Sequence, residues 1–217
     1  MDARIMSSII EFPVRVPDED IFRHEETRRL YGAWLGEARR GRHPALGAFA
    51  PGRLGRWLSW SGVAELVEEA GEPFADHRPR WRLAGSSICK LAGRELDGEE
   101  MFAGWQRFER SMLKRMILRT LREGHPFVAR LELGTTPGGR EFGLEMLALP
   151  FVEGKRTVAL VFFRPSFDTV TLVPEPLDKA RMVSLRALDL PATTEPPRTR
   201  LLDPAPVVPL FGAGGRP

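Results

Sequence analysis

Few residues of this chain could do chemistry, and their spacing matches no catalytic motif. The 217-residue sequence contains one cysteine, Cys89, and four histidines. His24-Glu25 begins like a zinc-protease helix, in which two histidines four residues apart bind the metal from one helical face. The second histidine is missing, because position 28 is Arg28. We therefore expect no metal site, no catalytic residues and no enzyme, with the histidines in surface or turn positions.

Other reactive patterns are also missing. The sequence has no nucleophile elbow, and Gly212–Gly215 has neither a strand before it nor a helix after it, so it is no phosphate-binding loop. Hydrophobic residues make up 42% and charged residues 28% of the chain, which is ordinary for a soluble domain. There is no long apolar run, no secretion signal and no second cysteine for a disulfide bond. We therefore expect a cytoplasmic protein that does not contact a membrane.

The strongest charge pattern lies in residues 106–122. This segment has helical periodicity, with Met112 and Met116 on its apolar face. Six basic residues occupy roughly the opposite half of the helix: Arg107, Arg110, Lys114, Arg115, Arg119 and Arg122. Such a stripe could bind phosphate groups or an acidic partner, although a charge run on a helix is more often its solvated face.

The elements around this helix are predicted from periodicity. In the leading segment, Leu30, Trp34 and Leu35 recur at helical spacing. The predicted helices are 21–40, a short helix at 51–60, a one-turn helix at 88–91 that ends at Gly93, a short helix at 96–105, and 106–122. Alternation of apolar and polar residues predicts five strands. These are 63–69, whose Glu and Ala would also suit a helix, 80–83, 127–133, 141–148 and 156–163, with turns at 134–139 and 150–155.

The two ends of the chain are predicted to lie outside the folded part. Residues 1–20 are expected to be extended, because Pro13 and Pro17 oppose a helix. Nine of the 19 prolines fall between Pro174 and the end, so 168–217 is predicted to be a mobile Pro-rich tail with one candidate helix at 177–188. The apolar Val207–Phe211 is either a passive end or a motif that docks on a partner. The domain is expected to span 21–167.

The order of these elements predicts an α+β fold, in which a five-stranded antiparallel sheet carries helices packed on one face. This order resembles the PAS domain family, and more specifically a group of small bacterial stand-alone PAS proteins. The resemblance covers about residues 24–165 and rests mostly on packing residues. They are Leu30, Tyr31, Trp34, Arg39–Arg42, Pro51, Leu54, Arg80–Gly85, Cys89, Leu91, Gly93–Leu96, Gly98, Trp105 and Leu149–Phe151.

The resemblance implies a sensory or regulatory module. PAS domains bind small molecules in a pocket covered by helices, or they dimerise and contact partners through the sheet and the flanking helices. The expected pocket residues are Trp81, Cys89, Trp105, Phe108, Met112, Met116, Phe127 and Met146. The expected interaction surface is made of Leu30, Trp34, Arg107, Arg110 and Lys114.

The cofactor chemistry of some PAS domains is not expected here. Light-sensing flavin PAS domains carry their reactive cysteine in a later helix, before Phe-Leu-Gln, whereas Cys89 lies in the first short helix and precedes Lys90-Leu91. Haem binding would need an axial histidine over the pocket, and none stands between Arg94 and Gly124. We interpret Cys89 as a core residue and expect no cofactor, with room for a small apolar ligand.

Two functions follow from the sequence. The first is a regulatory module with no attached effector, which acts in signal transduction by contact with a protein partner. Dimerisation through the leading helix, or a small ligand, would control it. The alternative is a basic adaptor that binds nucleic acid or another polyanion through the Arg107–Arg122 helix face. An acidic protein partner is favoured over nucleic acid for that face.

Overall fold

The computed structural model of the chain describes residues 21–38, 43–47, 49, 54–67, 78–135, 139, 141–166 and 176–188. The segment predicted to be extended, residues 1–20, lies outside the described residues. So does the tail after residue 188, including the apolar Val207–Phe211 motif.

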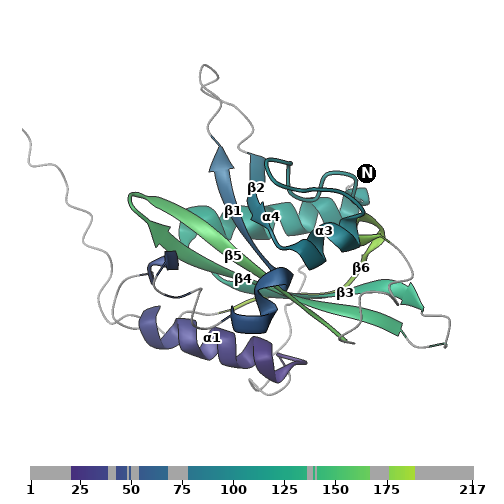
Figure 1. Cartoon of the computed structure of the whole chain (residues 1–217), viewed down its shortest axis with the longest axis horizontal. Helices are drawn as coiled ribbons and strands as arrows, with labels where there is room; N and C mark the ends of the chain where they lie inside the picture. Colours follow the sequence, from purple (N-terminus) through teal and green to yellow (C-terminus); the bar gives the residue numbers. More distant parts are fainter. Residues whose placement is uncertain are drawn as a thin grey trace, which may run out of the picture.

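A single antiparallel sheet forms the centre of the molecule (Figure 1). Its strands lie in the order β2-β1-β5-β4-β3-β6, and each neighbouring pair is antiparallel. The strands are β1 (Ser61–Val67), β2 (Arg78–Ala84), β3 (Phe127–Thr135), β4 (Glu141–Glu153), β5 (Arg156–Pro165) and β6 (Arg181–Ala187). The α+β class and the five predicted strands are confirmed, and β6 is a further strand.

Two of the helices in the described residues precede the first strand in the sequence, and the others connect strands. They are α1 (Glu25–Ala38), the 3-10 helix η2 (Gly55–Trp60), α3 (Ser86–Ala92), α4 (Arg107–Glu123) and the 3-10 turn η4 (Leu177–Lys179). As predicted, α3 ends at Gly93, whose left-handed conformation (φ 69°) suits a residue without a side chain. The helix predicted at 96–105 is wrong, because these residues form turns and an isolated bridge joins Glu100 to Arg80.

The turn segment 96–105 instead covers the outer edge of β2. The Trp81 N–H donates to the Glu99 carbonyl (2.9 Å), and the Met101 N–H donates to the Pro79 carbonyl (2.8 Å). At the end of β2, the Ala84 N–H donates to the Asp97 carboxylate (2.7 Å). The apolar spacing that suggested a helix has another cause. Met101 and its apolar neighbours are buried in the core although the backbone that carries them is irregular.

The helices that follow β2 lie on one face of the sheet, as predicted, and the leading helix α1 covers the other face. In Figure 1, α3 and α4 lie on one side of the sheet and α1 lies on the other. On the α4 side, Leu113 and Ile117 are fully buried, and α4 contacts β4 and β5. On the α1 side, the Trp34 Nε1–H donates to the Pro150 carbonyl (2.8 Å). Because β4 is covered from both sides, its central residues are buried without alternation.

The central strand β4 continues through the proline at which a turn was predicted. β3 pairs with β4 only as far as Ala148, so Pro150 lacks a neighbour on that side and its missing N–H breaks no bond there. Further along, the Val152 N–H donates to the Pro44 carbonyl (3.0 Å). The strand therefore ends at Glu153, and the chain turns at Gly154 and Lys155.

Part of the predicted tail is ordered. Residues 176–188 contain η4 and β6, which pairs with β3 at the edge of the sheet, so the candidate helix at 177–188 is wrong. The prolines Pro176 and Pro191 flank this segment, and none lies between them. Proline content averaged over the whole tail hid a strand that contains no proline.

Candidate functional site

A small cavity lies on the α4 side of the sheet, between β2, the turn segment after α3, and η4. Its volume is about 20 Å³, which is space for about one water molecule. Its lining residues are Trp81, Ala92, Arg94, Leu96, Glu100, Phe102, Ala103, Trp105, Phe163, Leu177 and Asp178.

The structure brings only some of the predicted pocket residues to this cavity. Trp81 and Trp105 line it. Three others are buried elsewhere in the core: Met116 is 8% exposed, and Phe127 and Met146 are fully buried.

Two predicted pocket residues point the other way. Phe108 is 64% exposed and Met112 is half-buried on α4. The buried side of α4 runs instead through Glu109, Leu113, Met116, Ile117, Thr120 and Leu121. The sequence pattern was therefore right about an amphipathic helix but placed the centre of its apolar face one residue too early.

Cys89 lies in the core and has no reactive environment. Its side chain is 7% exposed, and its thiol lies 3.8 Å from the Ala84 carbonyl oxygen. Burial raises the pKa of the Cys89 thiol, so the nucleophilic thiolate is disfavoured.

The sequence missed the cavity residues supplied by η4. Leu177 is 4% exposed, and the Asp178 Oδ1 atom is buried with no hydrogen-bond partner among the described residues. Both residues stand in the segment that was predicted to be a tail. A water molecule or a small donor group in the adjoining space could hydrogen-bond to Asp178. Pairing of β6 with β3 and contact with α3 place η4 there, and no local pattern encodes these contacts.

The predicted interaction surface is only partly exposed. Leu30 and Trp34 are 6% and 0% exposed, because α1 packs them against this chain's own sheet, so they are not surface residues. Arg110 and Lys114 lie 3.1 and 4.0 Å from the Glu100 carboxylate, which also pairs with Arg78 at 3.6 Å. Arg107 is exposed. Glu100 follows an irregular turn, so sequence spacing gave no sign of these ion pairs.

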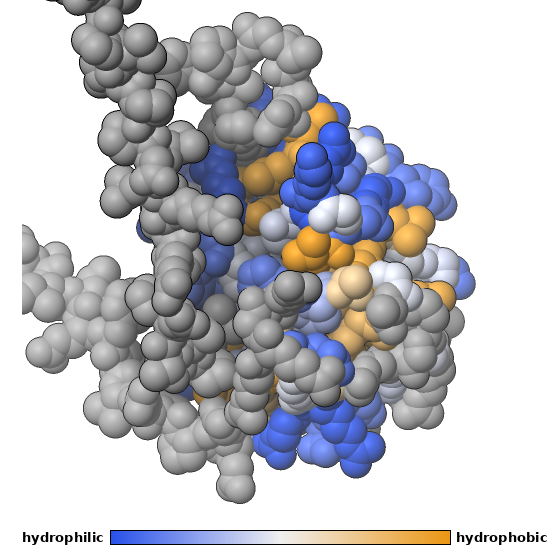
Figure 2. Space-filling view, turned by 90° about the vertical axis from the view of Figure 1, so that its left-hand side faces the viewer, coloured by the Kyte–Doolittle hydropathy of each residue, from blue (hydrophilic) through white to orange (hydrophobic). Residues whose placement is uncertain are grey.

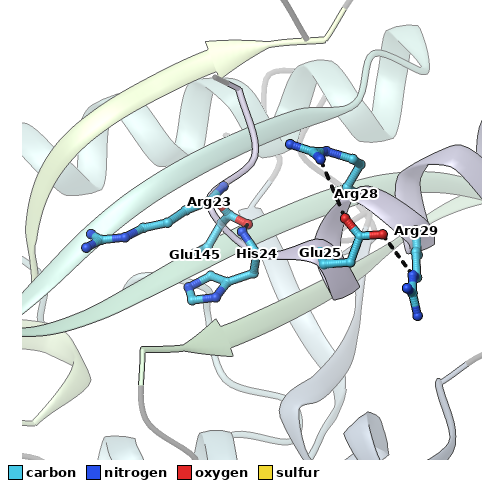
Figure 3. Close-up of polar contacts among 6 residues, drawn as sticks. All are labelled: Arg23, His24, Glu25, Arg28, Arg29 and Glu145. Carbon is cyan, nitrogen blue, oxygen red and sulfur yellow. Dashed lines mark hydrogen bonds and ion pairs between the residues drawn. The ribbon is translucent and has the colours of Figure 1, made fainter. Parts of the chain in front are cut away.

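A buried carboxylate fixes the start of α1 (Figure 3). Glu145 on β4 is 1% exposed and accepts hydrogen bonds from the backbone N–H groups of Arg23 (2.6 Å) and His24 (3.3 Å). The Arg130 Nε atom lies 3.9 Å from the same carboxylate. A carboxylate at a helix N-terminus satisfies free N–H groups and complements the helix dipole. Glu145 therefore serves as a cap supplied from more than 100 residues away.

The segment that resembled a zinc-protease helix has this structural role instead. His24 lies beside Glu145, and Glu25 pairs with Arg28 (3.5 Å) and Arg29 (2.9 Å), as Figure 3 shows. Burial lowers the pKa of His24 more than the nearby Glu145 raises it. Among the described residues, no three His, Cys, Asp or Glu side chains are grouped so that they could hold a metal ion.

A second charged contact joins α1 to the sheet. Arg164 on β5 lies 3.4 Å from the Glu26 carboxylate, and its guanidinium lies 4.4 Å from the centre of the Trp57 ring. Burial would raise the pKa of Glu26, but the bond from its own backbone N–H and the charge of Arg164 outweigh burial and lower the pKa. The polar contacts on this face therefore hold α1 in place on the sheet.

Comparison with known families identifies the family of this chain. A family model described as "PAS domain" matches residues 22–162, which is more than half of the 217 residues. No curated protein and no solved structure matches the chain. No helix in the described part of the chain is long and apolar enough to cross a lipid bilayer.

Proposed function

Since the chain belongs to the PAS domain family, whose members are typically sensory modules without catalytic activity, we propose that it regulates signal transduction by contact with a protein partner. The observation that carries this proposal is the match over residues 22–162, together with the helical layer on the antiparallel sheet. We place its action in the cytoplasm and attach no cofactor to it.

The surface supports an output by protein contact. Among the residues that the structure describes, four large apolar side chains are more than half exposed, each on a different element: Leu58 on η2 (58%), Leu83 on β2 (55%), Phe108 on α4 (64%) and Val183 on β6 (56%). Figure 2 shows one face of the molecule, where apolar side chains lie between hydrophilic ones. A transient protein interface is about as apolar as the rest of a protein surface, so these four side chains are the positions at which to test for a contact.

A small apolar ligand is compatible with this proposal only if the helical layer can adopt a second, expanded packing on the sheet. A space of about 20 Å³ holds about one water molecule, so a larger ligand would have to displace side chains such as Leu177 or Phe102. The ligand would then act by shifting the population toward the expanded packing. Native mass spectrometry of freshly purified protein, compared with the denatured chain, tests this step. An added mass that is lost on denaturation supports it, and identical masses contradict it.

Site-specific photo-crosslinking tests the contact itself. The full chain, carrying a photoreactive amino acid at position 58, 83, 108 or 183, is expressed in its native host and irradiated. A recurrent adduct with one protein at one or more of these positions supports the proposal, and an adduct of twice the chain mass identifies a homodimer. The tip of the β4–β5 turn at Lys155, which is exposed and charged, serves as the control position. Absence of a specific adduct at all four positions contradicts the proposal.

The alternative, a basic adaptor, finds less support. Two of the six basic residues on α4, Arg110 and Lys114, already share the largely buried carboxylate of Glu100. A face that binds nucleic acid depends on cations that are available to phosphate groups. Titration of a fluorescent DNA duplex at two salt concentrations tests this alternative. If binding does not depend on salt, the basic-adaptor function is excluded.

A further inference from the structure

The outward side of α4 carries a line of residues that the core does not use. Phe108, Met112, Arg115, Arg119 and Arg122 follow one another at intervals of four or three residues, so they form one stripe along the helix. We call these five residues the α4 stripe. With a rise of 1.5 Å per residue, it is about 21 Å long. Phe108, Arg115 and Arg122 are exposed, and Met112 and Arg119 are half-buried.

The cationic end of the stripe retains charge that the described structure does not neutralise. Arg115 and Arg122 form no ion pair with any described residue, and Arg119 pairs with Glu123 at 3.1 Å. That pair is exposed on both sides, and such pairs contribute only about 0–1 kcal/mol, so a partner could replace it. Glu100 does not reach the stripe, because it is held by Arg78, Arg110 and Lys114 on the flank of the helix. Glu109 is buried.

The other end of the stripe is apolar. Phe108 is 64% exposed, more than any other large hydrophobic residue among those described, and Met112 lies one turn further along. Aromatic, Met and Arg side chains are the types enriched at the centres of protein interfaces. A DNA duplex would contact the three arginines and leave the apolar end in water. A protein segment with apolar and acidic side chains would cover both ends.

We propose that the α4 stripe is the docking surface for an acidic amphipathic helix of a protein partner. The apolar residues of that helix lie on Phe108 and Met112, and its carboxylates pair with Arg115, Arg119 and Arg122. Helices that dock in this way present side chains at the same three- and four-residue spacing. The inference rests on the proposed function, because it names the surface and the partner chemistry for the protein contact.

Peptide binding to the full-length protein tests the docking surface. The probe is a fluorescein-labelled 20-residue helical peptide with leucines on two turns and glutamates on the next two turns of the same face. Comparison probes replace the leucines by serine or the glutamates by lysine, and a 20-base-pair DNA duplex is a fourth. Fluorescence anisotropy is measured at 50 and 300 mM NaCl. We expect the Leu/Glu peptide to bind most tightly and to weaken as salt increases, because its ion pairs are screened.

Variants of the protein then locate the site. Phe108→Ser, and separately Arg115→Glu combined with Arg122→Glu, should each weaken binding of the Leu/Glu peptide by about tenfold or more, as expected for central interface residues. Leu83→Ser is the matched apolar control, because Leu83 is 55% exposed on β2. Lys155→Glu combined with Arg156→Glu makes the same charge change at the exposed β4–β5 turn. Both controls should change binding by less than about twofold, since they lie outside the stripe.

Folding is checked by circular dichroism and thermal melting of each variant. If the Arg115→Glu/Arg122→Glu protein does not fold, Arg115→Ala combined with Arg122→Ala replaces it, with the same expected loss. The proposal is overturned if wild-type protein does not bind the Leu/Glu peptide, or if the control variants lose as much affinity as the stripe variants. It is also overturned if the duplex or the serine peptide binds as tightly, since the stripe would then be a general polyanion surface.

The two proposals fail in different ways. A photo-crosslinking adduct at position 83 or 183 but none at 108 overturns the α4 stripe as the docking surface and leaves regulation by protein contact intact. If none of the four positions gives an adduct, the proposal of regulation by protein contact is overturned, whatever the affinity of the peptide.

Discussion

The two longest helices in the described part of the chain cover opposite faces of one sheet and are attached to it in different ways. α1 combines the packing of Leu30 and Trp34 with individual polar contacts to the sheet, since Glu145 caps its start, Arg164 pairs with Glu26, and Trp34 donates to Pro150. α4 is held mainly by apolar packing through Leu113 and Ile117, which are fully buried. Each of these three polar contacts joins α1 or its first residues to a residue more than 100 positions away.

This difference teaches how each helix should respond to change. A directional contact fails as a whole when one partner is removed, and it leaves a buried polar group unsatisfied. Apolar packing is spread over many contacts and declines gradually with the volume removed. We therefore expect α1 to be sensitive to the identity of a few residues and α4 to be sensitive to the total apolar volume.

Removal of Trp34 is expected to have the largest effect. Trp34→Ala should lower the free energy of unfolding by about 3–5 kcal/mol, because a fully buried ring is lost. It also leaves the Pro150 carbonyl without its donor. Trp34→Phe keeps most of the ring and should lose about 1 kcal/mol for the hydrogen bond, in addition to the volume change. Urea denaturation followed by circular dichroism measures the free energy of unfolding of both variants. If Trp34→Ala lost less stability than Trp34→Phe, the packing described for α1 would be contradicted.

Neutralising the buried cap should have the next largest effect. Glu145→Gln places an amide where the N–H groups of Arg23 and His24 need an acceptor, and it should lower the free energy of unfolding by about 1–3 kcal/mol. Hydrogen exchange should become faster in the first turn of α1 and stay unchanged in α4. Arg130→Gln, which keeps the Glu145 carboxylate but removes the cation 3.9 Å from it and the donor to the Ile21 carbonyl (3.2 Å), is the comparison variant. Equal acceleration of exchange in both helices would contradict a cap that acts on α1.

A small change in the α4 packing should have a smaller effect. Ile117→Val removes one methylene group from a fully buried position and should lower the free energy of unfolding by about 0.5–1.5 kcal/mol. Hydrogen exchange should then respond along α4 as a unit, because no single bond is broken. An effect as large as that of Glu145→Gln would show that α4 is not more tolerant than α1.

The smallest expected effect is a pH dependence. Burial lowers the pKa of His24, and burial with the charge of His125 lowers the pKa of His43. Below pH 6.5 the unfolded chain therefore binds more protons than the folded one, so the free energy of unfolding falls as the pH decreases from about 7 and stops falling below the folded-state pKa values. His24→Gln combined with His43→Gln should flatten this slope in urea titrations between pH 7.5 and 5.5.

The carboxylates contribute in a separate pH window. The pKa of Glu26 and of Glu153 is lowered from 4.5 in the folded chain, so their stabilising effect is present above that pH and is lost as the pH falls through the range below it. These carboxylates therefore do not affect the range between pH 7.5 and 5.5. If the free energy of unfolding of the double histidine variant depended on pH there as in the wild type, groups other than His24 and His43 would cause that dependence.

Local patterns in the sequence were enough to predict most of the fold. The five strands and α4 follow from alternation and helical spacing, which each segment shows by itself. Segment 96–105 was mistaken for a helix because its buried side chains happen to be spaced like one. β6 was missed because an edge strand is specified by its neighbour β3 more than by its own composition.

The candidate site could be predicted less well for a physical reason. Whether Leu30 and Trp34 face solvent or the sheet depends on whether α1 docks on its own chain, and Glu145 decides that from β4. Phe108 and Met112 lie at the edge of the apolar face that the sequence predicts for α4. A rotation of the helix about its axis by the angle of one residue, about 100°, moves them from the core to the surface. Such choices depend on long-range contacts, which no local pattern contains.

The covered edge of β2 limits how this sheet could grow. Residues 97–101 occupy the hydrogen-bonding groups along β2, so within the described residues only β6 presents an unpaired edge. If two copies met through β6 about a twofold axis, each would use its single open side, and a third copy would find none. A sheet open at both ends could extend into a fibre, whereas this arrangement stops at a pair.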